Sequence, residues 1–488
     1  MKNKTIRVLF LASEADPLVK VGGLGDVSGS LPKALENLPP DEIDGNAVEV
    51  RLVLPFHSDI RKKIPNPVYL FNLEVQSIKG PVQAQAFFLE VNGIRTYLIA
   101  GPPIPEEGPV YNPVAAVDGP KFVFFSLASL ELAKKLDWKP DILHANDWHT
   151  ALSIYQLKIK KDPFFENTHT VLTLHNLPFF GVGTEAALTE YAIPPSRLKS
   201  LPSWARHLPL PLGLQAAEKI VAVSPTYARE ILTPEYGCGL EQFLKRRKKA
   251  IIGILNGLDQ DSWNPAIDPA IAVNYSTNSL DSRQENRKAL IYEFSLNTDP
   301  GIPIFILVSR MDHQKGVDIA IDGLRAIKDQ NWQAILLGAG DPNLERACLE
   351  LEQELPERVR AVIRFDTNLS RRIYGGGDIL LMPSRYEPCG LTQMMAMRYG
   401  CVPIARATGG LVDTISDLAA FPAKATGFLF NQPTVPAFVE AINRVYKAYL
   451  ILETWRQLQL HGMKQDFSWH QSAIAYAKTY QQLMKGDQ

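Results

Sequence analysis

Short apolar runs that end in a polar turn and lead into helical spacing recur along this chain. The first run covers residues 6–12, and helical spacing follows a glycine-rich turn and continues to about residue 36. Apolar runs of this length, bounded by turn residues, are typical of parallel strands buried on both faces. Strands that alternate with helices predict parallel sheets covered by helices, which is the doubly wound α/β architecture.

The pattern occurs in two blocks, because the periodicity stops between residues 261 and 299 and then resumes. A chain of 488 residues is also too long for a single hydrophobic core. We therefore expect two doubly wound, Rossmann-like domains, one in residues 1–259 and one in residues 260–464. Residues 472–485 have the spacing of an amphipathic helix.

The composition excludes several classes of function. Lys and Arg total 51 and Asp and Glu total 52, so no basic field is available for a nucleic acid. No apolar stretch is long enough to span a bilayer, and the N-terminus leads into a strand without a targeting segment. The four cysteines lack paired spacing, which indicates a reducing compartment. We expect a cytoplasmic protein without nucleic-acid or membrane partners, and without a metal, because no acidic cluster has metal-ligand spacing.

Residues 383–393 form the most informative turn of the sequence. They follow an apolar run at residues 378–382 and precede helical spacing, so they lie at the carboxyl end of a strand, where open α/β sheets bind ligands. We expect the following helix to begin near Gly390. Its first backbone N–H groups would have no partner within the helix and could bind a phosphate; they belong to Gly390, Leu391 and Thr392.

Two side chains of the same turn are chemically informative. Glu387 is a carboxylate that can face a sugar or a developing positive charge, although a solvated glutamate beside a capped helix is the alternative. Cys389 has no histidine near it in sequence, so we expect it to pack rather than to act as a nucleophile.

The second block also carries two cations and an aromatic residue at strand ends. Arg310 and Lys315 follow its first strand, and two fixed cations can hold a pyrophosphate without a metal ion. Phe365 could stack on a nucleotide base. An ordinary core aromatic is equally compatible with its spacing.

The first block supplies a glycine-rich turn and polar residues at two further strand ends. Gly22 and Gly23 let a backbone approach a ligand closely, but their spacing excludes the dinucleotide fingerprint. Lys20 beside them suits a diphosphate or a nucleotide-linked sugar, although an exposed lysine without a role is the alternative. Asp147 and His175 each follow a predicted strand and are candidates to contact sugar hydroxyls, although a packed histidine would have the same pattern.

Two stretches of the first block lack clear periodicity. Residues 101–119 are rich in Pro and Gly and predict a mobile surface loop, which carries Tyr111. Residues 179–215 contain several prolines and two aromatic patches. We expect a mostly irregular excursion there, which could bind an acceptor.

Together these groups suit the transfer of a sugar from a nucleotide. If the carboxyl edges of the two sheets face each other, the cations stabilise the departing diphosphate while a carboxylate stabilises positive charge at the anomeric carbon. A cleft between domains can close and exclude water, so that transfer outcompetes hydrolysis.

Eight motifs, spread over essentially the whole chain, closely resemble those of bacterial glycogen synthases and plant starch synthases. In chain order they are KVGGLGDV from Lys20, HANDWH from His144, HNL from His175, SPTYARE from Ser224, LNG from Leu255, SR and QKG from Ser309 and Gln314, RYEPCGLTQ from Arg385 and TGGL from Thr408. The sequence also departs from the family, because Val21 replaces a common threonine and residues 178–215 lack a frequent pattern.

The resemblance implies a GT-B fold and a metal-free, retaining transfer of glucose from ADP-glucose to the non-reducing end of an α-1,4-glucan such as glycogen, starch or a malto-oligosaccharide. It also implies that the C-terminal helix, residues 465–488, crosses back to the first domain. The residues implied to be catalytic are Glu387, His175, Asp147, Arg310 and Lys315. The residues implied to bind substrate are Lys20, Gly22, Gly23, Asp26, Tyr111, Asn256, Phe365, Cys389, Gly390, Leu391, Thr392 and Thr408.

Two other functions remain compatible with these residues. One is a transferase of the same fold that uses another donor or a small acceptor. The other is a glucan-binding or priming homologue that has lost turnover.

Overall fold

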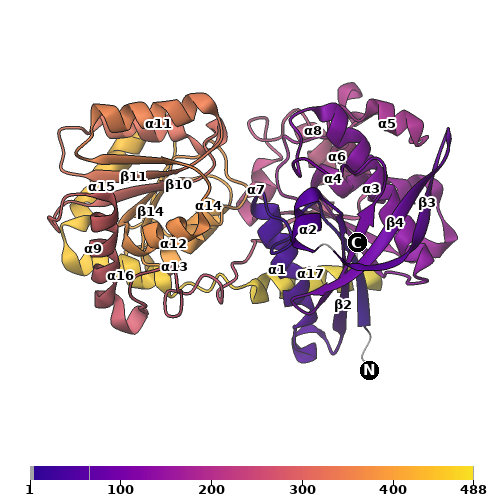
Figure 1. Cartoon of the computed structure of the whole chain (residues 1–488), viewed down its shortest axis with the longest axis horizontal. Helices are drawn as coiled ribbons and strands as arrows, with labels where there is room; N and C mark the ends of the chain where they lie inside the picture. Colours follow the sequence, from indigo (N-terminus) through magenta and orange to yellow (C-terminus); the bar gives the residue numbers. More distant parts are fainter. Residues whose placement is uncertain (1–4, 65, 487–488) are drawn as a thin grey trace. The chain divides into compact units, whose positions relative to one another are not determined.

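The computed structural model describes residues 5–64 and 66–486, and the chain divides into two compact units. The first unit contains the chain up to Gly257 and again from Trp469 onward, and the second unit spans Leu258–Ser468 (Figure 1). The sequence analysis placed these boundaries after residues 259 and 464. Within residues 5–64 and 66–486, no helix combines the length and apolar character that crossing a bilayer requires.

The first unit is built on a nine-stranded sheet with the order β3-β4-β5-β2-β1-β6-β7-β8-β9. Neighbouring strands are parallel except at the pairs β3–β4 and β4–β5, which are antiparallel. The strands are β1 (Thr5–Leu11), β2 (Ala47–Pro55), β3 (Val68–Ser77), β4 (Gly80–Val91), β5 (Ile94–Ala100), β6 (Ile142–Asn146), β7 (His169–Leu174), β8 (Lys219–Ala222) and β9 (Ile251–Gly253).

Nine α-helices accompany this sheet in the described part of the first unit. They are α1 (Gly23–Glu36), α2 (Ser58–Lys63), α3 (Ala115–Lys135), α4 (Asp147–Lys160), α5 (Glu185–Glu190), α6 (Pro209–Ala216), α7 (Pro225–Glu230), α8 (Glu241–Arg246) and α17 (Trp469–Lys485). Because α17 packs against α1, the end of the chain belongs to the first unit.

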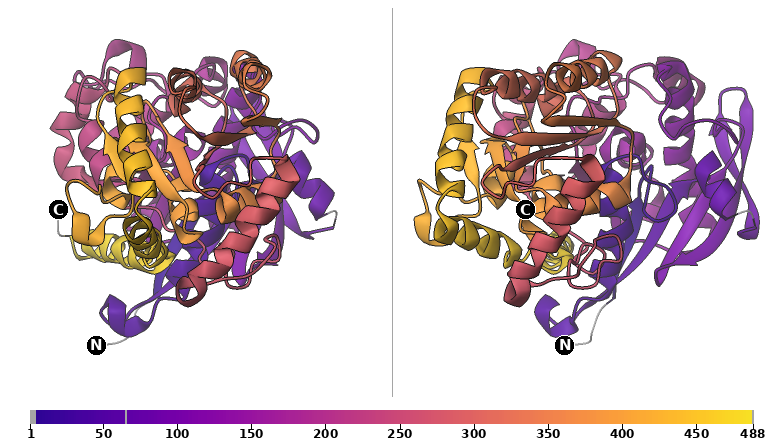
Figure 2. Two further views of the ribbon diagram at one scale, coloured as in Figure 1. Left: turned by 90° about the vertical axis from the view of Figure 1, so that its left-hand side faces the viewer. Right: turned by 60° about the vertical axis from the view of Figure 1, so that its left-hand side comes forward.

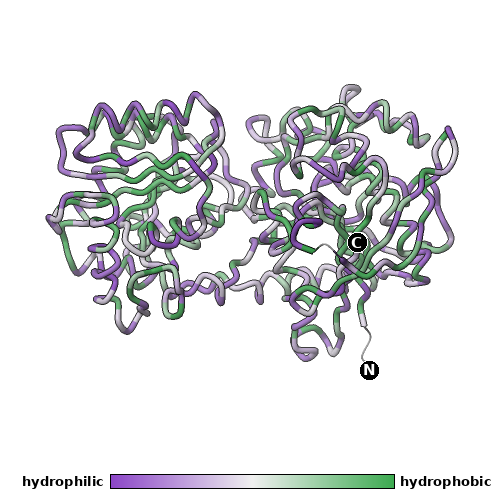
Figure 3. Tube along the Cα trace, viewed as in Figure 1, coloured by the Kyte–Doolittle hydropathy of each residue, from purple (hydrophilic) through white to green (hydrophobic). Residues whose placement is uncertain are grey.

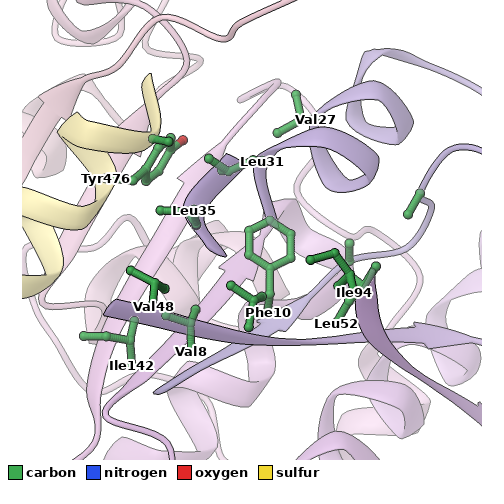
Figure 4. Packing of buried hydrophobic residues seen from close by; sticks show 14 of the residues in the cluster. Val8, Phe10, Val27, Leu31, Leu35, Val48, Leu52, Ile94, Ile142 and Tyr476 are labelled. Carbon is green, nitrogen blue, oxygen red and sulfur yellow. The ribbon is translucent and has the colours of Figure 1, made fainter. Parts of the chain in front are cut away.

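The hydrophobic core of the first unit lies between the sheet and the helices α1 and α17. Figure 4 shows Val8 and Phe10 of β1 beside Leu31 and Leu35 of α1, with Tyr476 of α17 close to them. All five side chains are buried. Strands covered on both faces by apolar helices read as continuous hydrophobic runs, which is why residues 6–12 could be recognised in the sequence.

One prediction for the first unit is wrong in its extent, and another is confirmed. Residues 101–119 do not form one loop, because α3 begins at Ala115. Residues 179–215 are mostly irregular, as predicted, although they also contain α5 and nearly all of α6. Pro209 opens α6, where a helix does not need the missing N–H.

The second unit is built on a six-stranded, wholly parallel sheet with the order β12-β11-β10-β13-β14-β15. Figure 3 colours these strands as mainly hydrophobic, and both views in Figure 2 show helices flanking them. The strands are β10 (Ile304–Val308), β11 (Gln333–Gly338), β12 (Val359–Ile363), β13 (Ile379–Met382), β14 (Val402–Arg406) and β15 (Phe428–Phe430). The helices are α9 (Arg283–Phe294), α10 (Val317–Ala326), α11 (Pro342–Glu354), α12 (Thr367–Gly376), α13 (Thr392–Arg398), α14 (Gly410–Thr414), α15 (Val435–Tyr449) and α16 (Leu452–Met463).

Each parallel sheet contains one point where the direction of winding reverses. In the first unit β1 lies between β2 and β6, and in the second unit β10 lies between β11 and β13. Doubly wound sheets bind ligands at the carboxyl ends of the strands that flank such a switch point. The loops that follow β1, β6, β10 and β13 are therefore the places to examine for a site.

Candidate active site

The loop after β1 surrounds a buried carboxylate, that of Glu14. This side chain is only 2% exposed and accepts hydrogen bonds from the backbone N–H groups of Val21 and Gly22, the latter at 3.1 Å. The hydroxyl of Tyr111 donates to it at 3.0 Å. Burial raises the pKa of the Glu14 carboxyl above its ordinary value. The sequence analysis did not select Glu14, although its place between β1 and the glycine-rich turn was a usable signal.

Tyr111, on the loop before α3, contacts the end of β1. Its hydroxyl lies 2.8 Å from Oγ of Ser13 and 3.0 Å from Oε1 of Glu14, and its ring stacks near the ring of His149. The half-buried tyrosine thus joins the loop to the end of β1.

Lys20 and Asp26 form an ion pair at the glycine-rich turn. Lys20 Nζ lies 2.5 Å from Oδ1 of Asp26, and both side chains are partly exposed. Gly22 is the N-cap of α1, which begins at Gly23. Lys20 is thus an accessible cation whose position is set by a carboxylate, and not an isolated surface lysine.

The loop after β6 orients the loop after β7. Asp147 has a positive φ of 53°, and its carboxylate accepts hydrogen bonds from the backbone N–H groups of His175 at 2.7 Å and Asn176 at 3.4 Å. His175 Nε2 lies 2.9 Å from Oδ1 of Asn146. Burial raises the pKa of the Asp147 carboxyl to about 7 and lowers the pKa of the His175 imidazole to about 3. His175 is therefore neutral at pH 7, while Asp147 changes charge near that pH.

Asn256 follows β9 and carries an amide oxygen without a partner. The residue is buried, and its Oδ1 accepts no hydrogen bond from any residue in the described part of the chain. Buried polar atoms without partners are rare in proteins, and a bound ligand is one way to satisfy them.

In the second unit the switch point between β10 and β13 is occupied by an ion pair. Lys315 Nζ lies 2.8 Å and 2.6 Å from the two carboxylate oxygens of Glu387, and Oγ of Ser384 donates to Oε2 at 3.2 Å. Glu387 is 4% exposed, so the alternative of a solvated glutamate is wrong. The sequence placed Lys315 and Glu387 in one region but did not foresee that they pair with each other.

Arg310 lies on the same loop after β10 as Lys315. Its Nη1 lies 2.8 Å from Oδ2 of Asp312, and its side chain is the more exposed of the two. The backbone N–H of Lys315 is bonded to the same carboxylate side chain, at 3.0 Å from Oδ1 of Asp312. Asp312 thus fixes both the loop that carries Lys315 and the guanidinium of Arg310.

Arg385 ties the loops after β10 and β13 together, and sequence reasoning missed it. It donates two hydrogen bonds to Asp318, at 2.8 Å and 2.7 Å, and one to the carbonyl of His313 at 2.9 Å. Its place two residues before Glu387 was the available signal. The effect is to hold Lys315 and Glu387 in register.

The turn before α13 differs slightly from its prediction. The helix begins at Thr392 rather than near Gly390, because Gly390 has a φ of +73° and cannot be helical. No hydrogen-bond acceptor within residues 5–64 and 66–486 is recorded for the backbone N–H groups of Gly390, Leu391 and Thr392. These donors remain able to bind an anion through the turn itself.

Residues on both sides of the turn are packed against it. Cys389 is buried, which agrees with the prediction that it packs, and Thr408 is buried as well. Gly410 donates its backbone N–H to the carbonyl of Glu387 at 3.1 Å, and a Cβ on Gly409 would lie 1.9 Å from that carbonyl oxygen. The glycines of the TGGL motif therefore let the loop after β14 approach Glu387.

Phe365, beyond the end of β12, is 72% exposed. The alternative that it is a core aromatic is wrong. An exposed ring at the carboxyl end of a strand can stack on a planar group.

The described residues offer no group of three or more His, Cys, Asp or Glu side chains placed to hold a metal ion. The groups that could neutralise a phosphate are instead Arg310, Lys315 and the amides of the turn before α13.

Comparison with known proteins gives consistent matches to both units. Residues 7–246 match the starch synthase catalytic domain, and residues 291–458 match the glycosyl transferases group 1 family. The glycogen synthase of Clostridium perfringens is 36% identical, covering 99% of each chain, and that of Aromatoleum aromaticum is 38% identical, covering 98% of this chain and 97% of its own.

Solved structures agree with these matches. The catalytic domain of starch synthase IV from Arabidopsis thaliana, bound to ADP and acarbose, is 31% identical, with a TM-score of 0.88 over 99% of this chain and 100% of its own. Sucrose-phosphate synthase from Thermosynechococcus elongatus, at 22% identity and a TM-score of 0.61 over 99% of this chain and 100% of its own, shares the fold alone. With two parallel-sheet α/β units and relatives that match along its whole length, the chain belongs to the glycogen synthase and starch synthase family of GT-B glycosyltransferases.

Proposed function

We propose that this enzyme takes glucose from ADP-glucose and adds it, with retention of configuration, to the non-reducing end of an α-1,4-glucan, releasing ADP without a metal ion. The observation that carries this proposal is the ion pair of Lys315 with Glu387 at the β10–β13 switch point, on loops that also carry Arg310 and the backbone N–H groups of Gly390, Leu391 and Thr392. The starch synthase IV structure contains ADP and acarbose, which supports ADP as the leaving group and a glucan as the acceptor.

The groups of the second unit suit a departing diphosphate. When the bond between the anomeric carbon and the phosphate oxygen breaks, negative charge develops on ADP and positive charge on the sugar. Arg310, Lys315 and the N–H groups from Gly390 to Thr392 would stabilise the first, and Glu387 would stabilise the second. Exposed Phe365 would stack on the adenine. Cys389 and Thr408, which are buried, would pack against the turn that binds the phosphates.

The groups of the first unit suit the hydroxyls of a sugar. Neutral His175 and, at another strand end, the unpartnered amide oxygen of Asn256 offer hydrogen-bond acceptors, and Asp147 orients the loop that carries His175. Lys20, together with Asp26 and the backbone of Gly22 and Gly23, would contact the donor, and Tyr111 would keep Glu14 in position there.

Release of ADP from ADP-glucose in the presence of a glycogen primer tests the proposal. We expect Arg310→Ala to lower the rate by a factor on the order of 100 or more, because one cation on the diphosphate is lost. Arg325→Ala is the matched control, since Arg325 forms its ion pairs with Glu354 and Asp322 on the surface of α10 and α11. No ADP release by the wild type, or transfer from UDP-glucose in its place, would refute the donor assignment.

A further inference from the structure

Asn146, the last residue of β6, joins three strand ends at the switch point of the first unit. Its side chain is fully buried. Nδ2 donates to the carbonyl of Leu11 on β1 at 2.9 Å, and Oδ1 lies 2.9 Å from Nε2 of His175 beyond β7. Thr150 fixes the backbone of Asn146, because its Oγ1 accepts from the N–H at 2.6 Å and donates to the carbonyl at 2.8 Å.

The hydrogen bonds leave one orientation for the amide of Asn146. The carbonyl of Leu11 can only accept, so it must face the NH₂ group and not the oxygen. The amide oxygen then faces His175, and it too can only accept. The proton on the imidazole must therefore lie on Nε2, and a neutral imidazole then carries its lone pair on Nδ1.

His175 is also fixed at its backbone. Its N–H donates to Oδ1 of Asp147 at 2.7 Å, so adjacent residues of β6 and α4 hold the two ends of the histidine. The structure records no hydrogen bond to Nδ1 from any described residue, and the residue is only half-buried. Because burial lowers the pKa of His175 to about 3, the neutral form is the relevant one at pH 7.

We propose that Asn146 is a positioning residue that locks His175 in the Nε2–H tautomer, so that Nδ1 serves as a hydrogen-bond acceptor for a hydroxyl of the bound sugar. The first half of this statement depends only on Asn146, Leu11 and His175, and the second half rests on the proposed function. In the opposite tautomer the same atom would donate, and a hydroxyl placed to donate to it would lose its partner. The tautomer therefore decides which substrate groups the site can accept.

Nuclear magnetic resonance of the full-length protein, with histidine labelled with ¹⁵N in the ring, tests the first half directly. Two-bond ¹H–¹⁵N correlations distinguish the two neutral tautomers from the imidazolium, and the spectrum of His175→Gln assigns the signal. At pH 7.5 without substrate, we expect Nε2 of His175 to carry the proton. A proton on Nδ1, or on both nitrogens, would overturn the proposal, and this result does not depend on what the enzyme transfers.

Substitution tests the second half. We expect Asn146→Leu, which keeps the size of the side chain, to release the tautomer and to slow transfer by about 10- to 100-fold, as is typical when a partner behind a functional histidine is lost. The affinity for ADP should not change. The matched control is Thr173→Val on β7, which removes a buried hydroxyl whose recorded hydrogen-bond partners are Nε2 of His144 at 2.7 Å and the hydroxyl of Tyr476 at 3.4 Å, and not His175. We expect it to lower the melting temperature but to keep the tautomer and the turnover.

The outcomes separate the two proposals. If Asn146→Leu keeps both the tautomer and the turnover, or if both variants slow turnover equally while the tautomer of His175 stays the same, Asn146 is merely structural and the inference is wrong. If the wild type has the expected tautomer but transfers nothing from ADP-glucose, the donor assignment fails and the tautomer lock stands. Should Asn146→Leu not fold, the wild-type spectrum alone still decides the lock.

Discussion

Replacing Lys315 with methionine leaves the carboxylate of Glu387 without its cation. Glu387 is the more buried partner, because its side chain is 5% exposed and that of Lys315 is 19% exposed. Removing one member of a buried ion pair costs about 3–5 kcal/mol, since the remaining charge stays desolvated and uncompensated. For a unit of this size each kcal/mol lowers the melting temperature by about 2–4 °C, so we expect the second unit to melt roughly 10 °C lower.

The same substitution should affect catalysis separately from stability. Lys315 supplies one of the positive groups proposed to stabilise the departing diphosphate, so turnover at 25 °C should fall by a factor on the order of 100 or more. Calorimetry and ADP release measure the two effects. Lys288→Met is the matched control: its ion pair with Glu285 is exposed and contributes at most about 1 kcal/mol.

A double variant isolates the coupling within the pair. Glu387→Gln keeps the shape of the side chain and removes the negative charge, so Lys315→Met combined with Glu387→Gln leaves no charge at the position of this ion pair. We expect the double variant to melt at a higher temperature than Lys315→Met alone. If the two losses simply add, or if Lys315→Met matches the wild type in melting temperature and turnover, the ion pair does not organise this site.

Three further substitutions test other parts of the structure. Burial raises the pKa of Asp147 from an ordinary 3.8 to about 7, so ionisation of this carboxyl destabilises the fold. The destabilisation is absent below about pH 4 and complete above about pH 7, so the gain in melting temperature from Asp147→Asn should grow across that range. A gain independent of pH would contradict this reasoning. Tyr480→Phe should lower the free energy of unfolding in urea by about 1–3 kcal/mol, because it leaves the buried Nδ1 of His144 without the hydroxyl that lies 2.7 Å away. An unchanged urea midpoint would show that this bond does not stabilise α17. Gly316→Ala should reduce the yield of folded protein, since Gly316 has a φ of +67° and a Cβ would lie 2.1 Å from the carbonyl oxygen of Pro383. A normal yield and a normal melting temperature would show that an alanine is tolerated at this position.

The architecture was predictable because it depends on local patterns. A buried parallel strand is apolar throughout, and the turn after it is polar or glycine-rich, so the loops that hold Asp147, His175, Arg310 and Glu387 could be placed at strand ends. Their side-chain partners could not. Lys315 and Glu387 are 72 residues apart, and they meet because β10 and β13 are adjacent, a fact that no local period encodes.

Burial was the second limit on prediction. Phe365 has the spacing of a core residue and is exposed, whereas Tyr111 lies in a stretch rich in Pro and Gly and is held by the end of β1. In each case the packing of distant segments, and not the local sequence, decided the outcome.

A crystal structure of the enzyme with bound ADP would show whether the β10–β13 switch point is the nucleotide site. We expect the diphosphate to lie within hydrogen-bond distance of Arg310, Lys315 and the backbone N–H groups from Gly390 to Thr392, with the adenine against Phe365. ADP bound elsewhere, with these groups making no contact to it, would contradict the assignment of this switch point as the nucleotide site.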